Sequence, residues 1–177
     1  MIIFLDIDGV LNDREFRLKG LKERNYSVLI DPNRVVLLKE IIDSTGAKII
    51  LSSSWNKFWD YNPVDCAGKQ INEALSAHGL RVEGKTPWIR DSTRNEEIEA
   101  WLREHSGVSS YVILDDNEHA WSKKLRSHWV KTDSDTGLNA ETVATAIAVL
   151  RGNLLPVPKE NNWKKLISKL RDAMESL

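Results

Sequence analysis

Two acidic residues and a glycine follow the first apolar run of the chain. The run from Ile2 to Leu5 is typical of a short buried strand, and it is followed by Asp6, Asp8 and Gly9. In an open α/β sheet, ligands bind outside the carboxyl ends of the strands, which is where these carboxylates would stand. The segment therefore predicts a site for catalysis or for a bound cation.

Two later apolar runs also end in polar residues. Residues 47–51 are followed by Ser52 and Ser53, and residues 111–114 by the acidic pair 115–116. A lone aspartate at such a place is commonly a turn or a helix cap, but three strand ends at one edge of a parallel sheet indicate a shared site. Clustered carboxylates repel one another unless a cation neutralises them, and oxygen ligands without His or Cys suit Mg²⁺ better than Zn²⁺. The sequence therefore predicts a magnesium-dependent site.

Helical patterns separate these strands. Asp31 and Pro32 are typical of a helix start and Gly46 of its end, and Thr93 predicts the cap of a helix over 94–105. Strands that alternate with helices indicate a doubly wound, Rossmann-like and mostly parallel α/β sheet with helices on both faces. The other expected elements are helices over 71–78 and 140–150 and short strands over 80–82 and 130–132.

Length and composition fit one main domain. The chain has 177 residues, of which 41% are hydrophobic, and this is enough to build a full core. We expect the domain over residues 1–152. Residues 153–177 are expected to form an extended linker and an amphipathic helix that docks on the domain rather than on a partner.

The overall charge and the apolar runs exclude some functions. A net charge of −1 gives no general attraction to nucleic acid or membrane, and no apolar run is long enough for a signal peptide or a membrane span. We therefore expect a cytoplasmic protein. The single cysteine, Cys66, excludes a disulfide framework and is interpreted as an incidental thiol rather than a nucleophile. The sequence indicates no protein partner and leaves the oligomeric state open.

Three strand segments resemble motifs of the haloacid dehalogenase-like (HAD) phosphatase superfamily. Residues 4–10, 49–52 and 112–116 resemble its first, second and fourth motifs, which are a strand ending in Asp-x-Asp-Gly, a strand closed by Ser, and a strand closed by paired acids. More narrowly, residues 1–150 resemble the HAD domains associated with RNA-repair proteins. The resemblance implies a Mg²⁺-dependent phosphatase and says nothing about residues 153–177.

The resemblance also implies a role for each acidic residue. Asp6 would attack phosphorus and form an aspartyl-phosphate, while Asp8 would act as general acid and then as general base. Mg²⁺ would be held by the Asp6 carboxylate, the Asp8 main-chain carbonyl and Asp116, with Asp115 orienting these ligands. Gly9 would let the backbone turn so that both Asp6 and Asp8 reach one phosphoryl group.

The phosphate-binding residues implied by the resemblance come from the other motifs. Ser52, with Ser53 as the next candidate, would bind the transferring oxygens. The third motif of the superfamily is a single Lys or Arg, and Arg94 fits it best because it opens the helix before the last motif. Lys85 and Arg90 are alternatives.

The shortness of the connections bears on the substrate. Family members that act on small metabolites usually carry a cap domain, and residues 12–31 and 56–92 leave no room for a large one, although a small lid over 56–92 stays open. The site is therefore expected to be open to a bulky substrate. Asn12 would contact this substrate, and a basic run would bind a nucleic-acid backbone: Arg14, Arg17, Lys19, Lys22 and Arg24. Bases would stack on Trp55 and Trp59.

Each of these substrate contacts has a simpler interpretation. The basic run is equally well explained as a solvated loop, and packing is favoured over stacking for both tryptophans. Packing is also expected for Trp88, Trp101, Trp121, Trp129 and Trp163. A role in orienting the substrate is open to His119 and His128, but surface positions are favoured for both.

The leading hypothesis is a phosphomonoester hydrolase that acts on a phosphorylated nucleic-acid end. A phosphoprotein or small-nucleotide phosphatase with the same chemistry is the alternative among enzymes. A non-catalytic module that keeps the fold and binds nucleic acid or protein is the alternative outside enzymes.

Overall fold

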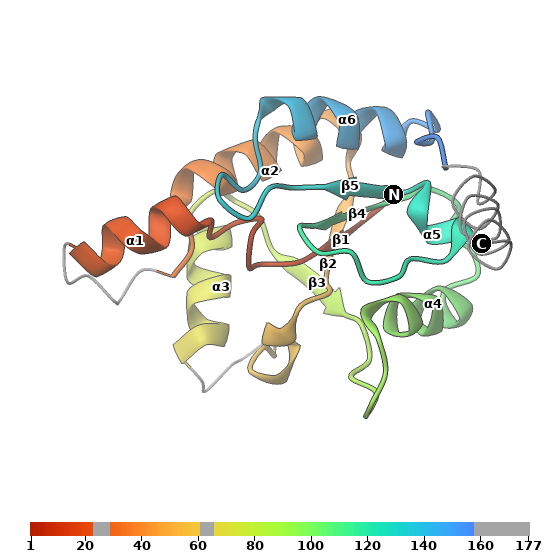
Figure 1. Cartoon of the computed structure of the whole chain (residues 1–177), viewed down its shortest axis with the longest axis horizontal. Helices are drawn as coiled ribbons and strands as arrows, with labels where there is room; N and C mark the ends of the chain where they lie inside the picture. Colours follow the sequence, from red (N-terminus) through yellow and green to blue (C-terminus); the bar gives the residue numbers. More distant parts are fainter. Residues whose placement is uncertain (23–28, 61–65, 158–177) are drawn as a thin grey trace, which may run out of the picture.

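The computed structural model describes residues 1–22, 29–60 and 66–157. Within them, five parallel strands form one sheet in the order β3-β2-β1-β4-β5 (Figure 1). The strands are β1 (Ile2–Leu5), β2 (Lys48–Leu51), β3 (Val82–Lys85), β4 (Tyr111–Asp115) and β5 (Trp129–Lys131). The helices are α1 (Arg14–Lys22), α2 (Pro32–Thr45), the 3₁₀ helix η1 (Ser54–Lys57), α3 (Cys66–Ser76), α4 (Arg94–Glu104), α5 (Lys123–Arg126) and α6 (Ala140–Leu150). The expected α/β sheet with helices on both faces is confirmed.

Successive strand residues point to opposite faces of the sheet, and the two faces are packed differently. Ile3 and Leu5 belong to a mostly aliphatic core that also contains buried residues of α2, α3 and α6. Phe4 belongs to a core rich in aromatic side chains beneath α4 and α5, where its ring meets that of Trp101 edge to face at 5.3 Å. The first strand is therefore covered on both sides, as a central parallel strand must be.

The helix starts and stops follow from local side-chain chemistry. The Asp31 carboxylate accepts a hydrogen bond from Asn33 N, and Gly46 ends the helix with a left-handed φ of 69°. Thr93 and Glu96 form a reciprocal capping box at the start of α4. These elements confirm the expected boundaries to within one or two residues.

Three elements differ from the expectation. Residues 14–22, expected as a solvated loop or a backbone grip, form α1, because the buried Asp13 carboxylate caps the first turn through Phe16 N at 2.8 Å. The strand expected over 80–82 begins at Val82 and runs to Lys85, and its Gly84 lies against Ile50 of β2. The helix expected over 71–78 already begins at Cys66.

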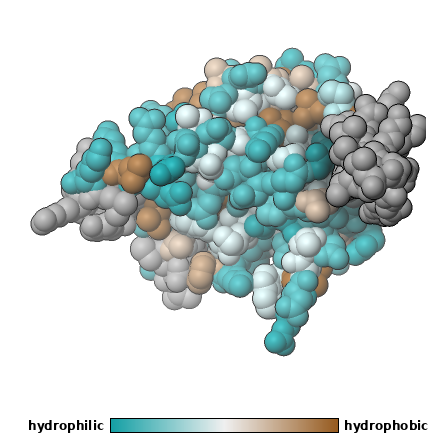
Figure 2. Space-filling model, in the orientation of Figure 1, coloured by the Kyte–Doolittle hydropathy of each residue, from teal (hydrophilic) through white to brown (hydrophobic). Residues whose placement is uncertain are grey.

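The segment after α6 is described only in part. Leu155 packs against the aliphatic core, and its N–H donates to Ser127 O at 2.9 Å, so the chain still lies on the domain there. The helix expected within 158–177, with Trp163, lies outside the described residues. The face of the molecule in Figure 2 is mostly hydrophilic. Among the helices that the structure describes, none combines the length and the apolar character needed to cross a membrane.

Candidate active site

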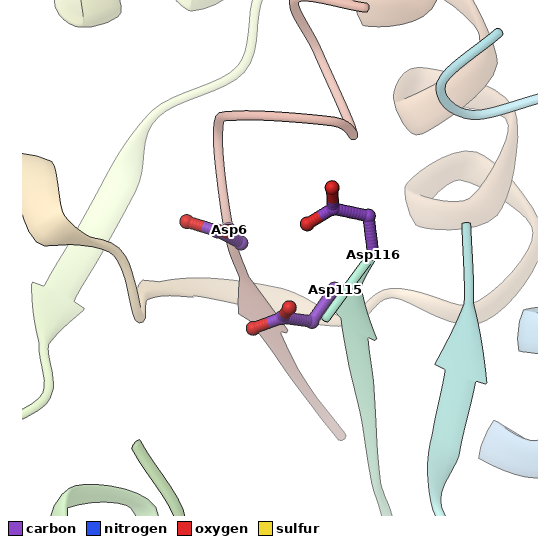
Figure 3. A group of neighbouring side chains, drawn as sticks. All are labelled: Asp6, Asp115 and Asp116. Atoms are coloured by element: carbon purple, nitrogen blue, oxygen red, sulfur yellow. The ribbon is translucent and has the colours of Figure 1, made fainter. Parts of the chain in front are cut away.

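Three carboxylates meet at the carboxyl ends of the two central strands. Asp6 follows β1, Asp115 ends β4 and Asp116 follows it, and each offers an oxygen within 4.8 Å of the others (Figure 3). The strand register causes this meeting, because Leu5 pairs with Leu114 and Asp6 N donates to Leu114 O at 3.0 Å. The predicted convergence of these two strand ends is therefore present.

The surroundings of Asp6 disfavour its charged form. Asp6 is only 6% exposed, and burial is the largest cause of a rise in its pKa to about 7. The neighbouring Asp115 raises the pKa further, while Arg94 and hydrogen bonds from Ser53 and Ile7 oppose the rise. The pKa of Asp116 is also raised, first by burial and then by Asp115. This protein environment alone does not balance three negative charges.

The donor set fits a hard divalent cation. All three side chains offer oxygen, which is the ligand type that Mg²⁺ prefers. Asp115 Oδ1 accepts from Asn117 N at 2.8 Å, but the buried Oδ2 has no aligned hydrogen-bond partner among the described residues. A cation beside these carboxylates would supply both the missing partner and the missing charge. The residues present therefore fit Mg²⁺.

Gly9 allows the backbone to pass directly over Asp116. Its φ is 72°, and a Cβ built on it would lie 2.3 Å from Asp116 Cγ, so no other residue fits without displacing that carboxylate. The buried Thr132 stabilises the same turn, because its hydroxyl donates to Gly9 O at 2.8 Å. Sequence reasoning missed Thr132, since the contact spans the whole domain.

Asp8 is held by two side chains. Trp55 Nε1 donates to one carboxylate oxygen and Asn12 Nδ2 to the other, both at 2.9 Å. The Asp8 carboxylate is not one of the three grouped acidic side chains. Trp55 is half-buried and packed against the aliphatic core, and its contact with Asp8 is a role that neither stacking nor packing had anticipated.

The two serines after β2 occupy different positions. Ser52 is buried, and its hydroxyl has no hydrogen-bond partner among the described residues. The Ser53 hydroxyl donates to Asp6 and also caps η1, where it accepts from Trp55 N at 3.4 Å. Ser53 therefore belongs to the surroundings of Asp6, and Ser52 offers a free donor directly after the strand.

The three candidates for the phosphate-binding basic residue differ in their contacts. Arg94 has a side chain only 12% exposed and an Nε without a partner in the described part of the chain, and its charge acts on Asp6. Lys85 Nζ instead donates to the carbonyl oxygens of Asn56 and Trp59, at 2.9 and 2.7 Å. Arg90 is 86% exposed. Arg94 is thus the candidate that the fold brings to Asp6.

Other residues named from the sequence lie as follows. Arg14 and Arg17 are exposed on α1, where Arg14 is 3.6 Å from Asp135. His119 is at the site, with Nε2 3.2 Å from Asp115, whereas the sequence favoured a surface position over a role in orienting the substrate. His128 is not at the surface either, because it is buried and stacked on Tyr111.

Among the tryptophans that the structure describes, all but one follow the expectation. Trp59, Trp101, Trp121 and Trp129 are buried, as packing requires. Trp88 is 59% exposed, so the prediction that it packs inside was wrong. It lies in the loop between β3 and α4, which leaves the sheet at the same edge as the site.

Comparison with known proteins assigns the chain to a family. A family described as the HAD domain in Swiss Army Knife RNA repair proteins matches residues 2–143, which include every grouped carboxylate, both serines and Arg94. A search of curated proteins and a search of solved structures each give no significant match. The match covers the whole sheet and all the motifs at its carboxyl edge. The chain therefore belongs to the family of HAD domains found in Swiss Army Knife RNA repair proteins.

Proposed function

We propose that the protein is a magnesium-dependent phosphomonoester hydrolase that works through an aspartyl-phosphate on Asp6 and acts on a phosphorylated nucleic-acid end. The observation that carries the proposal is the placement of Asp6, buried beside two further carboxylates and within the influence of Arg94 and Ser53. Membership of a HAD family supports hydrolase chemistry at this place.

The proposed reaction has two transfers. An Asp6 carboxylate oxygen attacks phosphorus, the bond to the leaving oxygen breaks, and Asp8 gives that oxygen a proton. Water then attacks phosphorus, Asp8 takes the proton of the water, and the bond to Asp6 breaks to release phosphate. Asp8 must stay directed at the reacting oxygen in both transfers, and its bonds to Trp55 and Asn12 fix its direction.

Charge on the transferring oxygens must be balanced by the surrounding residues. The Ser52 hydroxyl and the Arg94 guanidinium have unused donors, and we assign both to the phosphoryl oxygens, with Ser53 beside them. Mg²⁺, held by Asp6, Asp116 and the Asp8 main-chain carbonyl with Asp115 as support, would supply further positive charge against the phosphoryl group.

A nucleic-acid substrate is supported by two observations. The matched family is named for RNA repair. No cap domain stands over the site in the described residues, because the connection from η1 to α4 returns to the sheet as β3. An open site suits the end of a polymer better than a small metabolite.

The test is a phosphatase panel with and without Mg²⁺. The panel contains oligonucleotides phosphorylated at either end, a phosphopeptide and mononucleotides. We expect metal-dependent phosphate release, fastest from an oligonucleotide, and its loss in Asp6→Asn. Asp43→Asn, at an exposed carboxylate on α2, is the matched control and should keep full activity. Activity that survives in Asp6→Asn would contradict the mechanism, and preference for the phosphopeptide or mononucleotides would contradict the substrate class.

A further inference from the structure

The loop between β3 and α4 carries an exposed tryptophan. Trp88 is 59% exposed, whereas the other tryptophans that the structure describes are buried or half-buried. The loop stands out from the body of the molecule in Figure 1 and again in the space-filling view of Figure 2. Large aromatic side chains are mostly buried, so an exposed one on a protruding loop needs a reason.

This loop is anchored to the phosphate-binding side of the site. Thr86 N donates to Leu51 O at 2.9 Å, directly before Ser52, and the Thr86 hydroxyl accepts from Asn56 Nδ2 at 2.9 Å. Asn56 lies in η1, which follows Ser53. The first residues of the loop are thus bonded to the segment that carries both serines.

Its other end is anchored beside the basic residue of the site. The Ser92 hydroxyl donates to Ile89 O at 2.8 Å and lies 3.4 Å from Glu97 Oε1. Glu97 is also 3.6 Å from the Arg94 guanidinium. Both ends of the loop that carries Trp88 are therefore bonded next to the proposed phosphate-binding residues. The exposed indole is thus held at a fixed place relative to the site.

A cation lies over one face of the Trp88 ring. Lys57 Nζ is 5.1 Å from the ring centroid, and both side chains are exposed. This cation–π contact orients the indole and places a positive charge beside it. An aromatic face next to an ammonium is the combination that binds single-stranded nucleic acid, in which a base stacks and a backbone phosphate meets the cation.

We infer that Trp88 and Lys57 form a stacking platform for an unpaired nucleobase adjacent to the terminal phosphate. This inference rests on the proposed function and narrows its substrate to a single-stranded end. Trp88 would contribute base stacking and Lys57 a contact to the backbone. Both would affect substrate binding, and neither takes part in proton or phosphoryl transfer.

The test compares a phosphorylated single-stranded hexanucleotide with the same strand carrying an abasic terminal nucleotide. We expect Trp88→Ala to lower kcat/KM for the intact strand about 5- to 150-fold, which is the range for losing one stacked base. The abasic strand should react equally with both proteins. Trp88→Phe should restore most of the loss, and Val36→Ala, at an exposed apolar residue of α2, should change nothing.

Lys57→Gln separates the two parts of the platform. It should weaken binding of both strands, including the abasic one, and reduce the slope of log Kd against log salt by about 1, as the loss of one phosphate contact does. A loss that is equal for intact and abasic strands in Trp88→Ala would overturn the stacking role. Equal dependence on Trp88 for a blunt duplex end, or dependence only with a phosphopeptide, would also overturn the inference.

Direct binding keeps this test independent of turnover. The anisotropy of a labelled strand gives Kd for the wild type and for Trp88→Ala, with and without the terminal base. If no phosphate is released from any substrate but the base-dependent difference in Kd remains, the proposed hydrolase fails and the platform stands. If hydrolysis is intact and Kd shows no base dependence, the platform fails alone.

Discussion

The two sides of the candidate site differ in how far the protein satisfies its own polar groups. On the side of β2 and β3, Asn56 Nδ2 donates to Thr86, and Lys85 Nζ donates to two carbonyl oxygens. On the side of β1 and β4, three carboxylates crowd together, and Asp115 Oδ2 has no aligned partner among the described residues. We call the side formed by Asn56, Lys85 and Thr86 the polar wall, and the side formed by Asp6, Asp115 and Asp116 the acidic wall.

The difference assigns separate tasks to the two walls. In the polar wall, Asn56, Thr86 and Lys85 are hydrogen-bonded within the protein, so they form a rigid support for Trp55 and the loop that carries Trp88, and among the described residues only the Ser52 hydroxyl beside them is left free. The acidic wall is complete only when something positive enters, and burial already disfavours ionised Asp6. Substitutions in the acidic wall should therefore change ligand binding, activity and the pH dependence of stability, whereas those in the polar wall should lower stability and leave metal binding unchanged.

The largest effect is expected at Asp6, where activity and stability should change in opposite directions. Asp6→Asn should lower phosphatase activity about 1000-fold or more, as the loss of a nucleophile does. In the folded wild type the pKa of Asp6 is about 7 against an ordinary value of 3.8, so ionisation of this carboxyl destabilises the metal-free fold increasingly between these pH values and most strongly above pH 7. Urea unfolding at pH 8 without Mg²⁺ should show a more stable variant, with a gain on the order of a few kcal/mol.

The pH dependence of that gain is a check on its cause. The destabilisation develops as pH rises from 3.8 to about 7, and it is absent below this range, where Asp6 is protonated in both states. The two proteins should therefore converge in stability toward pH 4. A gain that persists unchanged at pH 4 would show that ionisation of Asp6 is not its origin.

Mg²⁺ should stabilise the acidic wall, and more so at high pH. At a free concentration of 100 times Kd, binding contributes about 2.7 kcal/mol, or roughly 5–10 °C in Tm for a domain of this size. Because Asp6 and Asp116 have raised pKa values and the metal needs them ionised, the shift should be larger at pH 8 than at pH 6. Scanning calorimetry at both pH values measures it, and equal shifts would contradict the assignment of these ligands.

In the polar wall, Thr86→Val should reduce stability without affecting the metal. Removing the hydroxyl leaves the buried Asn56 amide with one partner fewer, at a cost of about 1–3 kcal/mol. Urea unfolding measures the loss, and Thr145→Val, at a partly exposed helical hydroxyl of α6, is the control. A changed Mg²⁺ affinity in Thr86→Val would contradict the separate roles of the two walls.

Trp55 connects the two walls and should give the smallest effect. Trp55→Phe keeps the packing against the core but removes the hydrogen bond to Asp8, so kcat should fall about 10-fold while KM stays the same. Steady-state kinetics on an oligonucleotide measures both constants. If KM rises and kcat is unchanged, Trp55 contacts the substrate and does not position Asp8.

Local signals explain what the sequence predicted. The strands before Asp6 and Asp115 are short apolar runs, and the caps at Asp31 and Thr93 act within a few residues, so both can be recognised without knowing the fold. The convergence of Asp6 with Asp115 followed from one general property of parallel sheets. These features were enough to obtain the fold and the acidic wall.

The polar wall depends on contacts that the sequence does not mark. The bond between Asn56 and Thr86 joins residues 30 positions apart, and that between Trp55 and Asp8 joins residues 47 apart. β3 was misplaced because Gly84 and its charged neighbours hide the strand pattern. The exposure of Trp88 was missed because its residue type favours burial, and the sequence does not mark the bonds of Thr86 to Leu51 and of Ser92 to Glu97 that fix the two ends of its loop.

The identity of the nucleophile is tested most directly by trapping the intermediate. The wild-type protein is mixed with a phosphorylated oligonucleotide and Mg²⁺, quenched during turnover and treated with borohydride, which reduces an acyl phosphate to an alcohol. Peptide mapping by mass spectrometry should find homoserine at position 6, and none when substrate or Mg²⁺ is omitted. Reduction at position 8, or turnover with no reduced residue at all, would contradict the assignment of Asp6 as the nucleophile.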